Sequence, residues 1–293
     1  MPVFILISTE RGILQGLLRF DLYAVTLQVE VWVKFAGLLA VAFLGLGANG
    51  SAATLSLSVI CGWFVAREFA KRMLPIPAVQ KFTEISLLGQ DFGPLLVVYF
   101  SQVVINNSDL LLVKSYYPAD EAGHYAVLVL IGRIIFYGTW SATFTIFPIV
   151  AHRKARGEPH VYLFYGAFGF VAIIALVATL MAGIFSNQLI ASAFGSQYLA
   201  IAPLLWRYAV ATSLYALANV IVNYHIALGK TYGTFFVLGG GLLQIVGIIL
   251  FHKTLSEVVL VQIVVMVALL VVLLGWHLTQ MPESFIRPGG STG

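Results

Sequence analysis

The chain has 293 residues, of which 60% are hydrophobic and only 10% are charged, and its mean hydropathy is +0.96. Soluble domains carry about 25% charged residues, so this composition excludes a water-soluble fold. The net charge of +4 comes from lysines and arginines scattered among loops, unlike the single basic face of a nucleic-acid-binding protein. We therefore expect no nucleic acid among the partners.

Long apolar runs indicate helices that cross a bilayer, because a hydrocarbon core about 30 Å thick requires about 20 apolar residues per crossing. The runs are unbroken and lack the alternation of membrane β-barrel strands, so the predicted fold class is an all-α polytopic membrane protein. About eight spans are expected, at residues 22–46, 52–70, 92–113, 124–150, 160–185, 203–228, 232–251 and 256–278.

Residues 1–21 precede the first expected span. Within them, ERGILQGLLRF (residues 10–20) is apolar with an arginine near each end, which predicts a short helix lying at the membrane surface. The preceding MPVFILIS lacks the basic region and cleavage site of a signal peptide and is too short to span. The stretch is therefore interpreted as an N-terminal stub followed by an interfacial segment.

Residues 22–70 contain the first two spans, with two charges inside the first. Glu30 and Lys34 lie four residues apart, the acid-first spacing that favours an ion pair on one helix face. A charge inside a span is costly and is a functional candidate. Two interpretations stay open: the two residues only neutralise one another, or they take part in ion coupling.

Residues 71–90 are rich in basic residues and proline and are predicted to be a cytoplasmic linker. They separate the first two spans from a six-helix set at residues 91–278. Residues 279–293 form a polar tail rich in Gly and Pro that we expect to be disordered. Basic residues concentrate in alternate loops, which places both termini on the cytoplasmic side.

Enzyme and cofactor motifs are not supported. GLGANG (residues 45–50) has the letters of a dinucleotide fingerprint, but it joins two spans instead of a strand and a helix, so a tight turn is expected. The six histidines lie mostly at span ends, without metal-ligand spacing, which indicates interfacial placement. We expect no catalytic residue, no metal and no cofactor.

Polar side chains recur every three or four residues along three of the spans, which places them on one face of each helix. These stripes are Tyr99, Gln102, Asn106 and Asp109; Arg133, Tyr137 and Ser141; and Tyr208, Thr212, Tyr215, Asn219 and Asn223. We expect the stripes to face a shared polar interior that forms a translocation route. The alternative is interhelical hydrogen bonding worth about 0.6–2 kcal/mol each. For Asp109 and Arg133 we expect a hydrated cavity or a buried ion pair between them.

The stretch NNSDLLLVKSYYPADEAGHYAVLVLIGR (residues 106–133) resembles the start of the second lobe in oligosaccharide and polysaccharide flippases of the multidrug/oligosaccharidyl-lipid/polysaccharide exporter superfamily. The residues that match that family's D…GxY…R pattern, together with a proline expected to close the span, are Asp109, Gly123, Tyr125, Arg133 and Pro148. RGILQGLLRF (residues 11–20) is similar to the surface segment between the family's fourth and fifth spans. NYHIALGK (residues 223–230) is similar to the end of the tenth.

The resemblance implies two six-helix lobes that rock to open a central cavity alternately to each side. The chain would hold the second lobe and the last two helices of the first, without about four N-terminal spans. The implied activity is flipping of a polyprenyl-diphosphate-linked oligosaccharide across the bacterial plasma (inner) membrane for lipopolysaccharide or other polysaccharide biosynthesis, driven through Asp109 or Glu30. The implied partners are this lipid-linked oligosaccharide, membrane lipids and other polysaccharide-assembly proteins.

Three alternatives stay open. The chain could export amphipathic small molecules, as other members of the same superfamily do, or it could be a truncated transporter without function. A membrane-embedded glycan polymerase or transferase is the third, but such an enzyme would need a long outer loop with catalytic groups, and the expected outer loops are short. A non-enzymatic transporter is therefore preferred.

Overall fold

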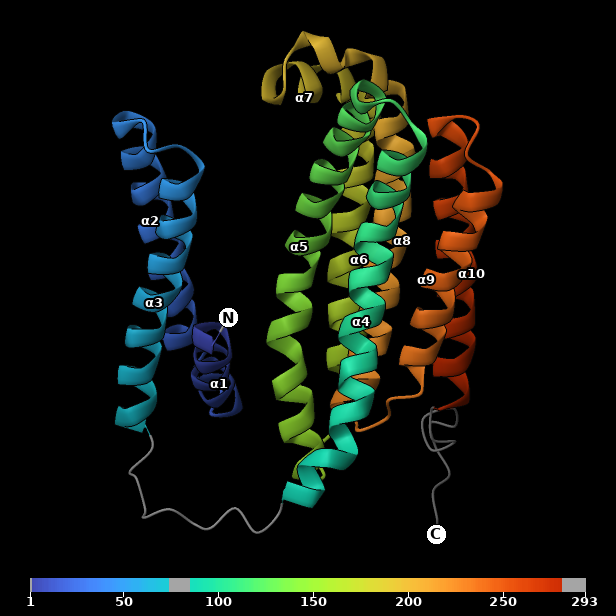
Figure 1. The fold of residues 1–293 in the computed structure, drawn as a ribbon. Coiled ribbons are helices and arrows are strands. Elements are labelled where there is room, and N and C mark those ends of the chain that lie inside the picture. The colour runs from blue at the N-terminus through green and yellow to red at the C-terminus, as the bar shows by residue number, and fades with distance from the viewer. Residues whose placement is uncertain (1, 74–84, 281–293) are drawn as a thin grey trace. The chain divides into compact units, whose positions relative to one another are not determined.

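The computed structural model describes residues 2–73 and 85–280, and the elements of these residues are all helices joined by short turns (Figure 1). Among the described residues, seven helical segments are long and apolar enough to cross a membrane. The expected all-α polytopic membrane fold is therefore confirmed. The expected span at residues 92–113 lies in a 32-residue helix that is not among those seven.

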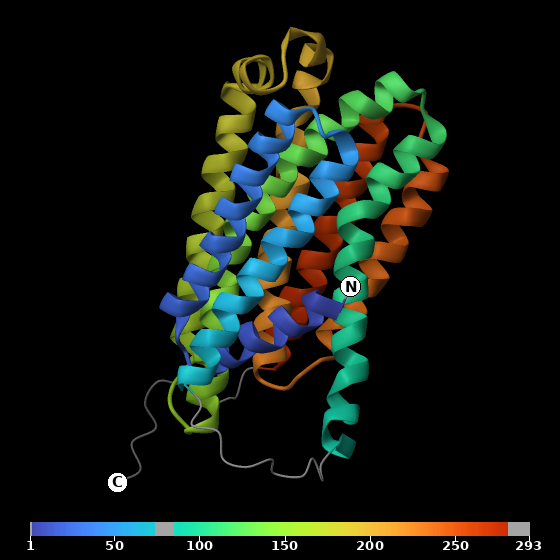
Figure 2. The same ribbon diagram turned by 60° about the vertical axis from the view of Figure 1, so that its left-hand side comes forward.

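The chain divides into two compact units, and the first comprises residues 1–83. Helix α1 (Pro2–Gly16) crosses the antiparallel pair α2 (Phe20–Leu44) and α3 (Gly47–Met73) obliquely (Figure 2). Gly45 and Gly47 join α2 to α3 at φ values of 65° and 60°, the left-handed region that glycine adopts without strain. The prediction of a tight turn at GLGANG is confirmed.

The N-terminal boundaries were predicted wrongly. Helix α1 begins at Pro2 and ends at Gly16, so the first residues belong to the helix instead of a separate stub before residue 10. Tertiary packing explains the difference. Ile7 is buried in a cluster with Val59 and Ala66 of α3, and this packing stabilises the helix in a short segment.

The predicted linker is also shorter than expected. Helix α3 continues to Met73 and the next helix begins at Ile85, so residues 71–73 and 85–90 are helical. Polar and basic residues lower the apolar signal at helix ends without interrupting the backbone hydrogen bonds, which is why hydropathy ended the spans too early. The other residues of the predicted linker, and residues 281–293 of the predicted tail, lie outside the described residues.

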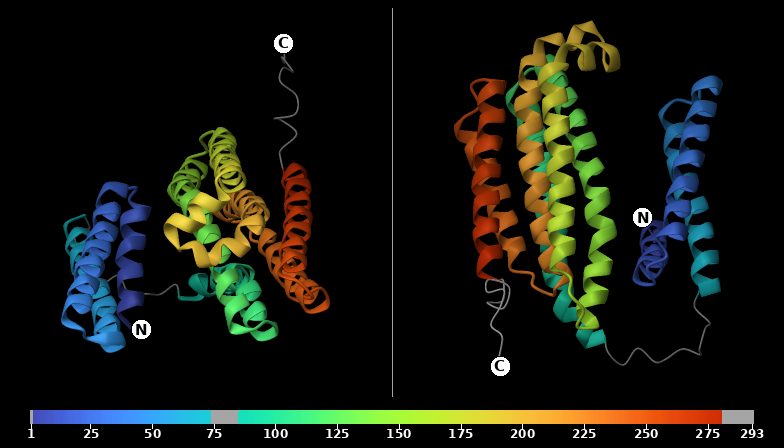
Figure 3. Two further views of the ribbon diagram at one scale, coloured as in Figure 1. Left: turned by 90° about the horizontal axis from the view of Figure 1, so that it is seen from above. Right: turned by 180° about the vertical axis from the view of Figure 1, so that it is seen from behind.

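The second unit begins at Glu84 and is a bundle of long, roughly parallel and antiparallel helices (Figures 1 and 3). Its long helices are α4 (Ile85–Tyr116), α5 (Ala119–Ala155), α6 (Val161–Ile184), α8 (Ala202–Ala227), α9 (Gly233–Leu250) and α10 (Leu255–Thr279). A short helix, α7 (Ser186–Ala193), and the 3-10 turn η1 (Ser196–Ile201) lie across one end of the bundle. Sequence analysis did not predict these two short elements.

Helix α8 is the centre of the second unit, because it packs against α5, α6 and α10, while α9 joins α4 to α10. Alanines at 202, 209, 211, 216 and 218 are buried along α8 and let the neighbouring helices approach closely. Pro148 does not close its span as expected: it lies inside α5, which continues to Ala155. Membrane helices tolerate an internal proline when neighbouring groups satisfy the freed backbone.

Candidate functional site

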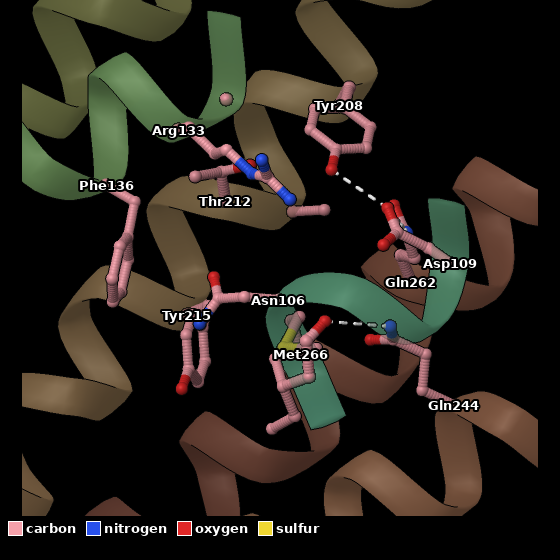
Figure 4. Close-up of a pocket in the computed structure, with 13 residues that line it drawn as sticks. Asn106, Asp109, Arg133, Phe136, Tyr208, Thr212, Tyr215, Gln244, Gln262 and Met266 are labelled. Atoms are coloured by element: carbon pink, nitrogen blue, oxygen red, sulfur yellow. Dashed lines mark hydrogen bonds between the residues drawn. The ribbon is translucent and has the colours of Figure 1, made fainter. Parts of the chain in front are cut away.

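Asp109 of α4 is the buried charge at the centre of the second unit, with 1% of its surface exposed. Its Oδ2 atom accepts a hydrogen bond from the Tyr125 hydroxyl of α5 and one from the Tyr208 hydroxyl of α8, both at 2.9 Å. Gln262 of α10 donates a third through Nε2 at 2.7 Å. Three different helices thus donate to one carboxylate oxygen. Figure 4 shows the bond from Tyr208.

The other oxygen of Asp109, Oδ1, is buried and has no hydrogen-bond partner among the described residues. The side chain lines a cavity of about 40 Å³ between α4, α5, α8, α9 and α10. The lining residues are Ile105, Asn106, Asp109, Gly132, Arg133, Phe136, Tyr208, Ala211, Thr212, Tyr215, Gln244, Gln262 and Met266. The cavity has room for water. It is far smaller than ligand pockets of about 300–1,000 Å³, so it does not hold a sugar head group.

Arg133 does not form the predicted ion pair with Asp109. Its Nη2 donates to Asn107 Oδ1 at 2.8 Å, and both residues are half-buried. Among the described residues, no cation lies within ion-pair distance of Asp109. Burying an ion pair costs several kcal/mol of desolvation per ion. Instead, Asp109 accepts from hydroxyl and amide donors, and Arg133 donates to an amide oxygen. The other expectation, a hydrated cavity shared by the two residues, agrees with the cavity that both line.

A second group of predicted route residues forms an amide chain between α4 and α8. Gln102 Nε2 donates to Asn219 Oδ1 at 3.0 Å, and Asn223 Nδ2 donates to the same oxygen at 2.8 Å. Asn106 Nδ2 donates to the backbone oxygen of Gln102 at 2.8 Å. The structure therefore brings these four residues together. The bond from Gln102 to Asn219 joins the two helices, and the other two bonds lie within one helix each.

Two aromatic residues of the predicted stripes lie elsewhere. Tyr137 is 58% exposed in the second unit, contacts the rings of Phe136 and Trp140, and does not line the cavity. Tyr99 is likewise exposed. The helical spacing predicts which residues share a face of a helix, but it does not predict which part of that face a neighbouring helix covers.

Two glutamines of the site were missed by sequence analysis. Besides Gln262, Gln244 of α9 is buried and donates through Nε2 to the Ile105 backbone oxygen at 3.1 Å and to Ser108 Oγ at 3.0 Å. Each glutamine stands alone in an otherwise apolar span. A lone amide in such a span is itself a signal, because an unsatisfied amide in hydrocarbon is costly and requires a partner helix.

Glu30, in the first unit, has two cationic partners. Lys34 Nζ lies 3.3 Å from Glu30 Oε1, so the predicted ion pair is present. Arg11 of α1, which was not predicted as a partner, lies 2.9 Å from Glu30 Oε2 and also donates to Thr26 Oγ1 at 3.0 Å. Each carboxylate oxygen of Glu30 lies within ion-pair distance of a cation, which favours the interpretation of mutual neutralisation over ion coupling at Glu30.

The histidines form no metal site. No group of three or more His, Cys, Asp or Glu side chains in the described part of the chain is placed to hold a metal ion. Two of the six lie at helix ends as predicted but are buried inside the bundle. His225 of α8 and His277 of α10 are buried and hydrogen-bonded to each other.

Fold and site together define a polytopic α-helical membrane protein with a buried carboxylate beside a water-sized cavity. Comparisons of the chain with protein-family models, with curated proteins and with solved structures find no match.

Replacing Gly132 with Ala is expected to lower the free energy of unfolding by about 1–3 kcal/mol, because the pocket wall is tightly packed there. A Cβ atom at Gly132 would lie 2.9 Å from Tyr208 Cδ1 and 3.0 Å from Thr212 Oγ1, so the Tyr208 ring must move away from Asp109. Thermal unfolding in detergent checks this. Gly138→Ala on the same helix is the control: its Cβ meets nothing within 4 Å, so equal melting temperatures of the two variants would contradict the expectation.

Proposed function

We propose that the chain is a transporter that moves a polyprenyl-diphosphate-linked oligosaccharide between the leaflets of a bacterial inner membrane, with both termini cytoplasmic. The multi-pass helical fold supports transport in general. The substrate class rests on the resemblance of residues 106–133 to polysaccharide flippases.

The proposal rests on the burial and the one-sided hydrogen bonding of Asp109. A carboxylate with three donors on one oxygen and none on the other, beside a cavity of about 40 Å³, is suited to gain and lose a proton or a monovalent cation. Membrane-embedded carboxylates commonly serve as such relays. Asp109 is therefore the proposed coupling group for an ion gradient.

Binding and release of the ion would change the packing of the bundle. Hydrogen bonds to an ionised carboxylate are about twice as strong as bonds between neutral groups, so a proton on Asp109 weakens the bonds from Tyr208 and Gln262. These two residues lie on α8 and α10, so α4 is held less tightly to both helices. A charge-dependent clamp of this kind gives the bundle two arrangements that an ion gradient can exchange.

The cavity that Asp109 and Arg133 both line is too small for a sugar, so the sugar rings of the head group would lie outside it. Arg133 is the proposed diphosphate ligand, since a guanidinium pairs bidentately with phosphate oxygens. Its present partner, Asn107, is neutral and exchangeable.

Replacing Arg133 with Gln is expected to raise the apparent KM for a lipid-linked oligosaccharide about tenfold or more, because a charge-assisted hydrogen bond is worth about 1.5–3 kcal/mol. The measurement is leaflet exchange of a fluorescent lipid-linked oligosaccharide in proteoliposomes with an imposed pH gradient. Arg153→Gln, the same change in the last turn of α5, is the control and should leave the KM unchanged.

Two results would overturn the proposal. If the full-length protein moves no lipid-linked oligosaccharide but exports amphipathic dyes, the substrate class is wrong. If it moves neither, with or without a gradient, while its α-helical content and abundance are normal, transport by this chain is wrong.

A further inference from the structure

A pair of buried histidines joins α8 to α10 at the ends of both helices. His225 Nε2 and His277 Nδ1 lie 2.9 Å apart, which is hydrogen-bonding distance, and the two residues are 2% and 4% exposed. Only one ring nitrogen of a neutral imidazole carries a proton, so one ring donates to the lone pair of the other. The contact therefore couples the tautomers of the two rings, because the donating ring carries its hydrogen on the nitrogen in the contact and the accepting ring carries its hydrogen on the other nitrogen.

The outer nitrogens of the pair have no partner. His225 Nδ1 and His277 Nε2 are buried and accept or donate no hydrogen bond among the described residues. On the ring that donates within the pair, the outer nitrogen has a free lone pair; on the ring that accepts, the outer nitrogen carries a hydrogen. One of the two outer nitrogens is therefore a basic nitrogen with a free lone pair, and no described donor forms a hydrogen bond to it.

Aromatic rings enclose the pair on both sides. The ring centroid of Phe164 of α6 lies 4.2 Å from that of His277, with 31° between the planes. The indole of Trp276 lies 4.2 Å from the His225 ring. A cation over an aromatic face within about 6 Å is stabilised by about 0.5–2 kcal/mol, more when desolvated. An imidazolium in this place has such a face on each side.

The charged groups around the pair are already engaged. Lys230, after α8, donates to Gln280 Oε1 at 3.0 Å, and Lys154 of α5 donates to the Leu228 backbone oxygen. Neither histidine forms an ion pair with a carboxylate of the described residues. A charge on the pair is therefore not cancelled by an acid, and the nearby lysines limit how much positive charge it can take.

The remaining titratable neighbours are His160 and Tyr224. His160, before α6, lies with Nδ1 3.0 Å from the Tyr224 hydroxyl. Burial, and then the charge of Lys154, lower the pKa of His160 from its usual value.

We propose that His225 and His277 form a binding site for a single shared proton, separate from Asp109. The proton adds to the free lone pair of the donating ring, and the resulting imidazolium makes a charge-assisted hydrogen bond to the neutral second ring. A second proton would place two cations in contact and is disfavoured, so the pair titrates as one unit. No bond other than N–H forms and none breaks.

Proton binding here strengthens the contact between α8 and α10, the same two helices that donate to Asp109. Tyr208 and His225 are 17 residues apart on α8, which corresponds to about 25 Å at 1.5 Å per residue. The two sites therefore act on opposite parts of one helix pair. The shared proton site does not depend on the substrate proposed for the protein.

Solid-state NMR of the full-length protein with ¹⁵N-labelled histidine in lipid bilayers tests the proposal between pH 8 and pH 5. We expect one non-protonated ring nitrogen of the pair to gain a hydrogen while the other persists, giving one proton for two rings. The exposed His152 provides the single-ring reference, identified by the loss of its signals in His152→Gln. The proposal would be overturned if the pair took up two protons over the pH interval in which His152 takes up one. It would also be overturned if the pair took up no proton between pH 8 and pH 5.

Fluorescence of Trp276 gives a second readout, since an imidazolium in ring contact quenches indole emission. The part of the emission that Trp276→Phe removes is expected to fall on acidification, and this fall should disappear in His225→Gln and in His277→Gln. His152→Gln should keep it. An unchanged acid-dependent loss in both pair variants, with melting temperatures that show them folded, would assign the quenching to another group and refute the shared proton site.

Discussion

Asp109→Asn is expected to lower the rate of gradient-driven transport by about tenfold or more, while the bundle stays folded. Asparagine has nearly the same shape, and its carbonyl oxygen still accepts from Tyr125 and Tyr208, but it neither carries a charge nor binds a proton. A tenfold loss corresponds to about 1.4 kcal/mol in the barrier. The measurement is leaflet exchange of the labelled lipid-linked oligosaccharide with and without a pH gradient.

The matched control is Asp120→Asn, which removes a carboxylate that is 90% exposed at the start of α5. It should transport at the normal rate. Full activity of Asp109→Asn under a gradient would remove Asp109 from the coupling mechanism, whatever the substrate.

Asp109→Leu separates the structural from the coupling role. It leaves the donors of Tyr125, Tyr208 and Gln262 without their acceptor, and each buried unsatisfied group costs about 1–3 kcal/mol. The leucine variant should therefore melt at a clearly lower temperature than Asp109→Asn. Equal melting temperatures would mean that the three donors find other partners.

Glu30→Ala is expected to destabilise the first unit by about 1.5–3 kcal/mol, because Arg11 loses the acceptor of a charge-assisted hydrogen bond at a half-buried position. Arg11 and Lys34 both lose their carboxylate, and Arg11 is the more buried of the two, with 14% of its side-chain surface exposed against 37% for Lys34. Helix α1 should detach from α2 first, because Arg11 is the residue of α1 that bonds Glu30 and Thr26. Limited proteolysis at the N-terminus and thermal unfolding measure the effect.

The comparison variant is Lys34→Gln, which removes the more exposed charge of the same group. An exposed helix pair at this spacing is worth about 0.3–0.5 kcal/mol, so only a small shift is expected. If Lys34→Gln destabilises as much as Glu30→Ala, the ion pair within α2 is more important than the contact between α1 and α2.

Hydropathy predicted the spans well because the signal is local. A run of about 20 apolar residues forms a membrane helix whatever its neighbours are, and the expected spans at 160–185 and 203–228 differ from α6 and α8 by one residue at each end. The Glu30–Lys34 pair and the turn at GLGANG were predicted for the same reason, since both depend on residues within one turn of helix or loop. The end of α5 was missed because its polar last turns are helical without being apolar.

The helical membrane fold, the positions of the spans and the unusual carboxylate Asp109 inside one of them can all be predicted from the sequence. The surroundings of Asp109 cannot, because its donors Tyr125, Tyr208 and Gln262 lie 16, 99 and 153 residues away along the chain. The stripe pattern fixes which face of a helix is polar, but not which helix covers it. That choice depends on the packing of whole helices, which put Gln262 against Asp109 and left Arg133 with Asn107.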